Sequence, residues 1–129
     1  MTAPAPSLIR ETRVTAASTD TFGRVMCSAR NHHFVIDGPV PNGCPGEAIT
    51  PPEAFLAAVA SCGVELAQVI GKEDGLNVTR VGASIYGKVD RGNPVRPDVT
   101  LFNEVRIAFT IEGPTPQESA SIVEKFKKR

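Results

Sequence analysis

The stretch TPPEAFLAAVASCGVELAQVIGKEDG, residues 50–75, decides the fold of this chain. Its body, Ala54–Glu73, is rich in Ala, Leu and Val and contains no proline, and Gly75 follows as a helix stop. About 20 residues make a helix roughly 30 Å long. The helix start carries a capping box with proline at the first helical position, formed by Thr50, Pro51 and Glu53.

The predicted helix is apolar on nearly all sides, with Glu65 as the only charge between Glu53 and Lys72. A helix of this composition is buried on most of its surface. Its first half also holds small side chains that let other backbones approach closely, namely Ala57, Ala58, Ala60, Ser61 and Gly63. We therefore expect a central helix wrapped by a sheet or by a second subunit.

Alternating apolar and polar residues on both sides of this helix predict β-strands. A weak strand is expected over Leu8–Ala16, a second around Val25–Ala29, and a third around Phe34–Ile36. After the helix, Val81–Val89 and Leu101–Ile111 each show a period of two, and Thr115-Pro-Gln-Glu118 begins a last helix. Grouped strands separated by helices indicate an α+β fold with a mostly antiparallel sheet.

The composition limits the classes of function. The 129 residues suit a single domain, 1–129, and residues 1–6, small and proline-rich, are expected to be loose. Balanced charges, 14 basic and 14 acidic, predict no nucleic-acid partner. No apolar run approaches the roughly 18 residues that cross a bilayer, and no signal peptide is visible, so no membrane partner is expected. Three cysteines without an export signal favour the reducing cytoplasm.

Cys62 is the candidate reactive group, because it lies in the middle of the predicted helix among small and apolar neighbours. The alternative is that Cys62 is a packed thiol, since buried free cysteines commonly act as small hydrophobes. Only a thiolate attacks an electrophile, and position 62 is too far from the helix start for the macrodipole to help. A cation from elsewhere in the fold must therefore stabilise the thiolate, and the candidates are Arg24, Arg30, Arg10 and Arg13.

Glu53 has two interpretations, as the capping carboxylate or as the group that holds such an arginine. Nine residues separate Glu53 from Cys62, so on a straight helix they face opposite sides, roughly 13 Å apart along the axis. They can share a site only through a kink or a neighbouring subunit. On the Cys62 side of the helix, a pocket for an alkyl chain is expected to be lined by Phe55, Val59 and Leu66.

The other cysteines and the histidines carry weaker signals. Cys44 lies in a Pro/Gly-rich loop and is expected to be accessible, either as an incidental thiol or as a second redox group. Cys27 alternates with apolar residues and is expected in the core. His32 and His33 are adjacent, so on a strand they point to opposite faces and cannot bind one metal together. We expect no metal site and no cofactor.

Two segments together resemble the OsmC/Ohr family, and most closely its general OsmC-like branch. They are Arg30-Asn-His-His-Phe-Val-Ile-Asp37 and, after the Gly-rich loop, Thr50-Pro-Pro-Glu-Ala-Phe-Leu-Ala-Ala-Val-Ala-Ser-Cys62. The resemblance extends over residues 8–129. It implies a swapped homodimer in which antiparallel sheets from both chains wrap two long central helices. It also implies a site at the subunit interface, where Glu53 and Cys62 can share one site although they face opposite sides of a single straight helix.

The resemblance further implies a thiol peroxidase that reduces organic hydroperoxides in oxidative-stress defence. Matched to the family motif, Cys62 is the peroxidatic cysteine, Glu53 orients an arginine, and Arg30 is the first candidate for that arginine, with Arg24 second. Active members carry a second cysteine just after the last helix, whereas this chain ends at Arg129, apparently inside that helix. A sulfenic acid on Cys62 would then need an external thiol or dithiol, or Cys44.

Two other functions compete with the peroxidase. A non-catalytic OsmC-like dimer would bind a small hydrophobic ligand at its interface, with Cys62 as packing, and that binding would survive Cys62→Ser. A stress-related structural dimer with vestigial chemistry is the third hypothesis, and the missing second cysteine favours it.

Overall fold

The computed structural model describes residues 8–129, so the loose stretch expected at residues 1–6 lies outside the described residues. The chain forms two compact units that meet in sequence between Pro51 and Pro52. Helices and antiparallel sheets occur in separate stretches of sequence, so the chain has the predicted α+β fold.

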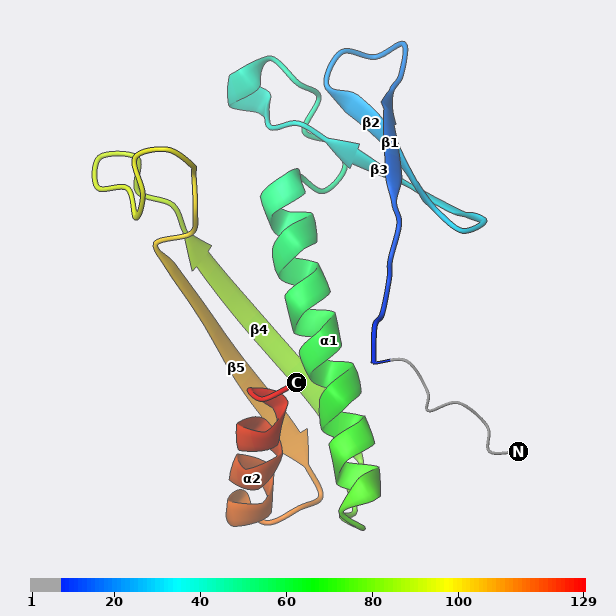
Figure 1. Ribbon diagram of the computed structural model, residues 1–129, viewed down its shortest axis with the longest axis vertical. Helices are drawn as coiled ribbons and strands as arrows, with labels where there is room; N and C mark the ends of the chain where they lie inside the picture. Colours follow the sequence, from blue (N-terminus) through cyan, green and yellow to red (C-terminus); the bar gives the residue numbers. More distant parts are fainter. Residues whose placement is uncertain (1–7) are drawn as a thin grey trace. The chain divides into compact units, whose positions relative to one another are not determined.

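The N-terminal unit is built on a three-stranded antiparallel sheet of order β1-β2-β3 (Figure 1). Its strands are β1 (Thr15–Ser18), β2 (Arg24–Ala29) and β3 (His32–Asp37), and a 3₁₀ turn, η1 (Val40–Asn42), follows. β2 and β3 pair along their whole length, from Arg24 opposite Asp37 to Ala29 opposite His32. This full pairing brings the two ends of a 14-residue hairpin together, which places a cation and an anion side by side.

The first strand is shorter and begins later than the predicted Leu8–Ala16. β1 contains only the residues that pair with β2, from Thr15 opposite Ser28 to Ser18 opposite Val25. Leu8 and Ile9 are exposed, at 96 % and 73 %. The prediction was wrong here because a ladder of hydrogen bonds, rather than apolar composition, decides where a strand begins.

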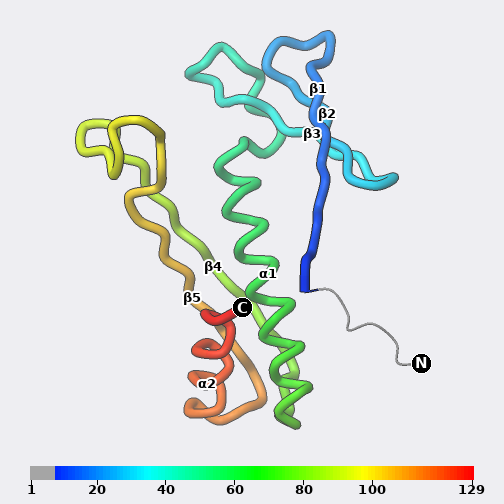
Figure 2. The backbone as a smooth tube through the Cα atoms, in the orientation of Figure 1, coloured from blue at the N-terminus to red at the C-terminus, as the bar shows by residue number. Residues whose placement is uncertain are grey.

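The C-terminal unit contains a long helix, a hairpin and a short helix. They are α1 (Pro51–Glu73), β4 (Arg80–Lys88), β5 (Glu104–Glu112) and α2 (Pro116–Phe126). Exposed and partly buried residues alternate strictly along β4, as the period of two predicted. Gly75 has a φ of +67°, which confirms it as the residue that ends α1. Figure 2 shows the β4–β5 connection at the end of the hairpin opposite to α2.

The capping box predicted for the last helix is present. The Glu118 amide donates to the Thr115 hydroxyl at 3.2 Å, and the Thr115 amide donates to the Glu118 carboxylate at 2.9 Å. Pro116 occupies the first turn, where its missing N–H is not needed. Helix α2 ends at Phe126, and a turn that begins at Lys127 follows it.

The core of the C-terminal unit lies where α1 meets α2 and the hairpin. Ala67, Ile70 and Ile122 are fully buried there. The partly buried residues packed against them are Leu66, Leu76, Val78, Val81, Ile111 and Phe126. Burying an isoleucine side chain contributes about 1.5–3 kcal/mol, so this cluster holds the unit together.

Helix α1 also has the length and composition of a membrane-spanning helix, and it is the only such helix among residues 8–129. This differs from the expectation that no apolar run is long enough to span a bilayer. The core helix of a globular domain has the same features, so length and composition alone assign no membrane role. The absence of a membrane partner stays a prediction.

Candidate functional site

Cys62 is the exposed member of the three cysteines. Cys27 is buried, as predicted for a core position, and Cys44 is half-buried. Among residues 8–129, no side chain forms a hydrogen bond or an ion pair with the free Cys62 thiol. In the single chain its sulfur is therefore accessible to a small electrophile.

The position of Cys62 on α1 follows from which face of the helix packs on the hairpin. Gly63 is buried against that hairpin so closely that a Cβ there would lie 2.8 Å from the Phe109 ring. A larger residue at this position would force the Phe109 ring to move. Because successive residues are rotated by about 100°, Cys62 is turned away from the hairpin. Two residues of the same stripe, Phe55 and Ala58, are also exposed.

The structure places the other residues proposed for the site on different elements. Glu53 lies in the first turn of α1 and is exposed. Arg30 lies in the β2–β3 turn with a φ of +56°, a left-handed conformation that is unusual for arginine. Arg24 begins β2. Both arginines belong to the N-terminal unit, whereas Glu53 and Cys62 belong to the C-terminal unit.

Arg24 is held by a buried carboxylate. Its Nε and Nη2 atoms donate to the two oxygens of Asp37, at 2.8 and 2.9 Å, and Nη2 also donates to Glu47 at 3.3 Å. The Asp37 side chain is completely buried and accepts two further bonds, from the backbone amides of Glu47 and Ala48, each at 2.9 Å. Four hydrogen bonds therefore satisfy one buried carboxylate and tie the loop after η1 to the hairpin.

These contacts change the ionisation of both groups. The hydrogen bonds from the Arg24 guanidinium hold the pKa of the Asp37 carboxyl well below its ordinary value, although burial opposes this shift. The same pairing raises the pKa of Arg24. Both groups are therefore charged at neutral pH.

Cys44 fills a niche made by two glycines. A Cβ on either Gly23 or Gly38 would collide with the Cys44 sulfur. The Gly38 amide donates to the Gly23 carbonyl at 2.8 Å and closes the niche. The Cys44 side chain thus packs beside the Arg24–Asp37 pair and is less accessible than that of Cys62.

Of the three residues predicted to line an alkyl pocket, Phe55 lines a cavity in the structure. The cavity has a volume of about 830 Å³ and a mainly apolar wall, formed by Pro52, Phe55, Val89, Arg91, Thr100, Leu101 and Phe102. Leu66 packs against the core instead. Val59 is half-buried and lines none of the described cavities.

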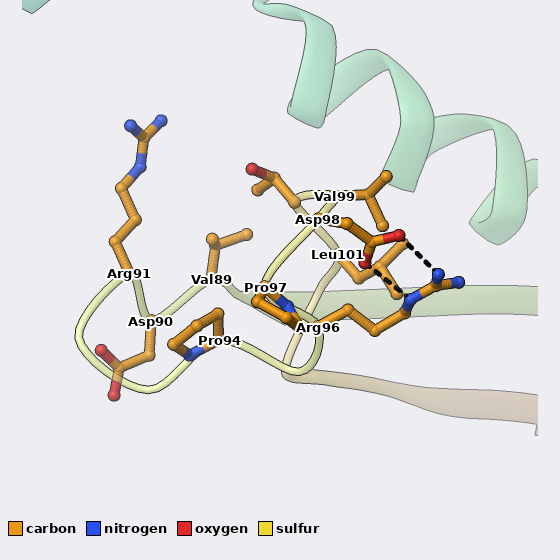
Figure 3. A pocket seen from close by; sticks show the side chains of 10 residues that line it. Val89, Asp90, Arg91, Pro94, Arg96, Pro97, Asp98, Val99 and Leu101 are labelled. Carbon is orange, nitrogen blue, oxygen red and sulfur yellow. Dashed lines mark hydrogen bonds and ion pairs between the residues drawn. The ribbon is translucent and has the colours of Figure 1, made fainter.

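A smaller cavity of about 200 Å³ lies within the β4–β5 connection (Figure 3). It shares Val89, Arg91, Thr100 and Leu101 with the larger one. The sequence of this connection, with its glycine and prolines, is typical of a turn region, and its one signal of a site is the pair of arginines, Arg91 and Arg96. Among residues 8–129, no group of three or more His, Cys, Asp or Glu side chains could hold a metal ion.

Comparison with known protein families gives one match. The family model described as "OsmC-like protein" matches residues 44–129, which include α1 and the whole C-terminal unit. No curated protein sequence matches the chain.

Solved structures share the fold. An OsmC-like protein from Mycoplasma pneumoniae has a TM-score of 0.78 at 15% identity, covering 93% of this chain and 82% of its own. An organic hydroperoxide resistance protein OsmC from Legionella pneumophila has a TM-score of 0.69 at 18% identity, covering 95% and 85%. An organic hydroperoxide resistance protein from Elizabethkingia anophelis, with thiocyanate bound, has a TM-score of 0.74 at 15% identity, covering 95% and 85%.

Proposed function

The chain belongs to the OsmC-like family, and from this premise we propose that it is a thiol-dependent peroxidase that reduces organic hydroperoxides through Cys62. The observation that carries the proposal is the exposure of Cys62 in the middle of α1, since the other two cysteines are more deeply packed. The names of two structural neighbours, organic hydroperoxide resistance proteins, support the substrate class.

The reaction needs no metal or cofactor. The Cys62 thiolate attacks the terminal oxygen of the hydroperoxide, so that an S–O bond forms while the O–O bond breaks. The released alkoxide takes up a proton and leaves as an alcohol, and the sulfur becomes a sulfenic acid. An external thiol then condenses with the sulfenic acid to form a mixed disulfide and water. A second external thiol attacks the outer sulfur of that disulfide, so that an external disulfide forms and the Cys62 thiolate is released.

The proposed site also needs a cation near the Cys62 sulfur and apolar side chains around it. We assign the cation to Arg30, oriented by Glu53, because Arg24 is already held by Asp37. Withdrawing the Arg24 guanidinium would leave a buried carboxylate without its partner, which is strongly unfavourable. The protein acts as a homodimer in this proposal. The exposed small residues of α1 near Cys62, such as Ala58 and Ser61, support it, because they let a second helix approach closely.

Peroxidase assays with cumene hydroperoxide and a dithiol reductant test the proposal. Cys62→Ser should abolish the activity, whereas the matched change Cys44→Ser should leave most of it, because a dithiol replaces any second thiol of the protein. Arg30→Gln should lower kcat/KM by about 10²-fold, as the loss of one charge-stabilising group commonly does. Equal rates for wild type and Cys62→Ser would reject the peroxidase.

The second candidate function is a non-catalytic dimer that binds a small hydrophobic ligand. The mainly apolar cavity beside Phe55 favours it, since its volume of about 830 Å³ suits a small molecule. Ligand binding that persists in Cys62→Ser, together with no peroxidase activity in the wild type, would select this function. For either function we place the protein in the cytoplasm, where reduced thiols are maintained.

A further inference from the structure

The cavity at the start of α1 has an aromatic wall and a single charge. The Phe55 and Phe102 rings stack with their centroids 5.6 Å apart and an angle of 26° between their planes. Leu101 and Val89 extend the apolar surface, and Thr100 supplies one hydroxyl. Arg91 is the only ionisable residue of this wall.

Arg91 differs from the neighbouring arginine of the same connection. Arg96 is paired with Asp98, to which its Nε and Nη2 atoms donate at 3.0 and 2.6 Å. Figure 3 shows the Arg96 guanidinium turned onto that carboxylate, while the Arg91 side chain extends away from both. Within residues 8–129, Arg91 has no hydrogen-bond or ion-pair partner. Its guanidinium is therefore available to a ligand.

The nearby carboxylates do not neutralise this charge. Asp98 is paired with Arg96, and the Asp90 carboxylate, which accepts a hydrogen bond from the Gly92 amide at 2.9 Å, points away from the Arg91 guanidinium (Figure 3). Neither aspartate lines the larger cavity. The cavity thus combines apolar walls with one uncompensated positive charge, a pattern that complements a molecule with an apolar body and one anionic group.

We propose that this cavity is a binding site for a small amphiphilic anion, such as a medium-chain carboxylate. The carboxylate pairs with Arg91, whose planar guanidinium can donate two parallel hydrogen bonds to it. The apolar chain lies against Phe55 and Phe102, where water is displaced from aromatic surface. This proposal goes beyond the peroxidase, because no step of the binding uses the Cys62 sulfur.

The site shares one side of α1 with the proposed reactive thiol. Phe55 and Cys62 are seven residues apart on α1, so they share one side of the helix and are separated by about 10 Å along its axis. A ligand anchored at Arg91 and Phe55 would extend toward Cys62 if its chain followed the helix. Arg91 is therefore a specificity-determining residue for any ligand that uses this stripe of α1.

Calorimetric titration of the full chain with octanoate and with octan-1-ol tests the proposal, because the two probes share a chain length and differ in charge. We expect the wild type to bind octanoate about tenfold more tightly than octan-1-ol, the range of one charge-assisted contact. Arg91→Gln should remove this preference and leave the affinity for octan-1-ol unchanged. The matched control Arg106→Gln should change neither affinity, since Arg106 lies on β5 and lines neither of the two cavities.

Three results would overturn the proposal: equal affinities of the wild type for the two probes, full octanoate affinity in Arg91→Gln, or no binding of octanoate at millimolar concentration. Backbone amide shifts on adding octanoate supply a second readout and should centre on Val89, Leu101 and Phe102. Shifts centred elsewhere would place the ligand in another site and count against the proposal. Repeating the titration with Cys62→Ser separates the two proposals, because loss of peroxidase chemistry leaves this affinity intact.

Discussion

The two units of this chain are stabilised in different ways. In the C-terminal unit, Ala67, Ile70 and Ile122 form an apolar core. In the N-terminal unit, among the residues described, the buried side chains are those of Cys27 and Asp37. The N-terminal unit therefore relies on one buried carboxylate that accepts four hydrogen bonds, whereas the C-terminal unit relies on the burial of apolar side chains. The difference teaches that a small unit with little apolar content can be held by a fully satisfied polar group.

The largest effect is expected from a mutation in the apolar core of the C-terminal unit. Ile122→Ala should destabilise the C-terminal unit by about 2–5 kcal/mol, because a completely buried side chain leaves a cavity. Urea unfolding followed by circular dichroism measures the loss. The control is Val105→Ala on β5, where the side chain is 45 % exposed and the cost should be much smaller. Equal unfolding midpoints for Ile122→Ala and the wild type would contradict the assigned core.

A smaller effect is expected from a mutation that removes the Arg24–Asp37 ion pair of the N-terminal unit. Arg24→Gln should raise the amide exchange rates of Glu47 and Ala48 by about tenfold or more, because the loop loses the cation that balances Asp37. Hydrogen exchange measured by mass spectrometry resolves this region from α1. Arg96→Gln, which removes an arginine from an exposed ion pair, should leave the same amides unchanged. Unaltered protection of the loop in Arg24→Gln would show that the Asp37 contacts do not hold it.

The smallest effect concerns how the stability of the N-terminal unit depends on pH. Because the pKa of Asp37 is lowered in the folded protein, its contribution to stability is complete above the ordinary value near 3.8 and is lost as the pH falls below it. Loop protection should therefore decline from pH 5 to pH 3 more steeply in the wild type than in Asp37→Asn. Parallel pH profiles in the two proteins would assign the acid sensitivity to other groups.

The sequence predicted the positions of single site residues on their helices and strands, but not how these residues are arranged together. The position of Cys62 in the middle of a helix follows from the local pattern of residues 50–75. The assignment of Leu66 to a pocket stays a prediction, and in the structure its side chain packs against the core, because neighbouring residues on one side of a helix can face different partners. The roles of Cys62, Glu53 and Arg30 stay predictions until the proposed kinetic tests are made.

Several elements follow from the sequence alone, because the interactions that form them are local. Capping hydrogen bonds span three residues at Thr115 and Glu118, a left-handed glycine ends α1 at Gly75, and alternation along β4 needs only neighbouring positions. Which distant charges form ion pairs depends on how the chain folds in three dimensions. Arg24 pairs with Asp37, thirteen residues away, and Arg91 lines a cavity. The physical reason is that a side chain's partner depends on how elements pack, and no periodicity along the chain encodes that distance.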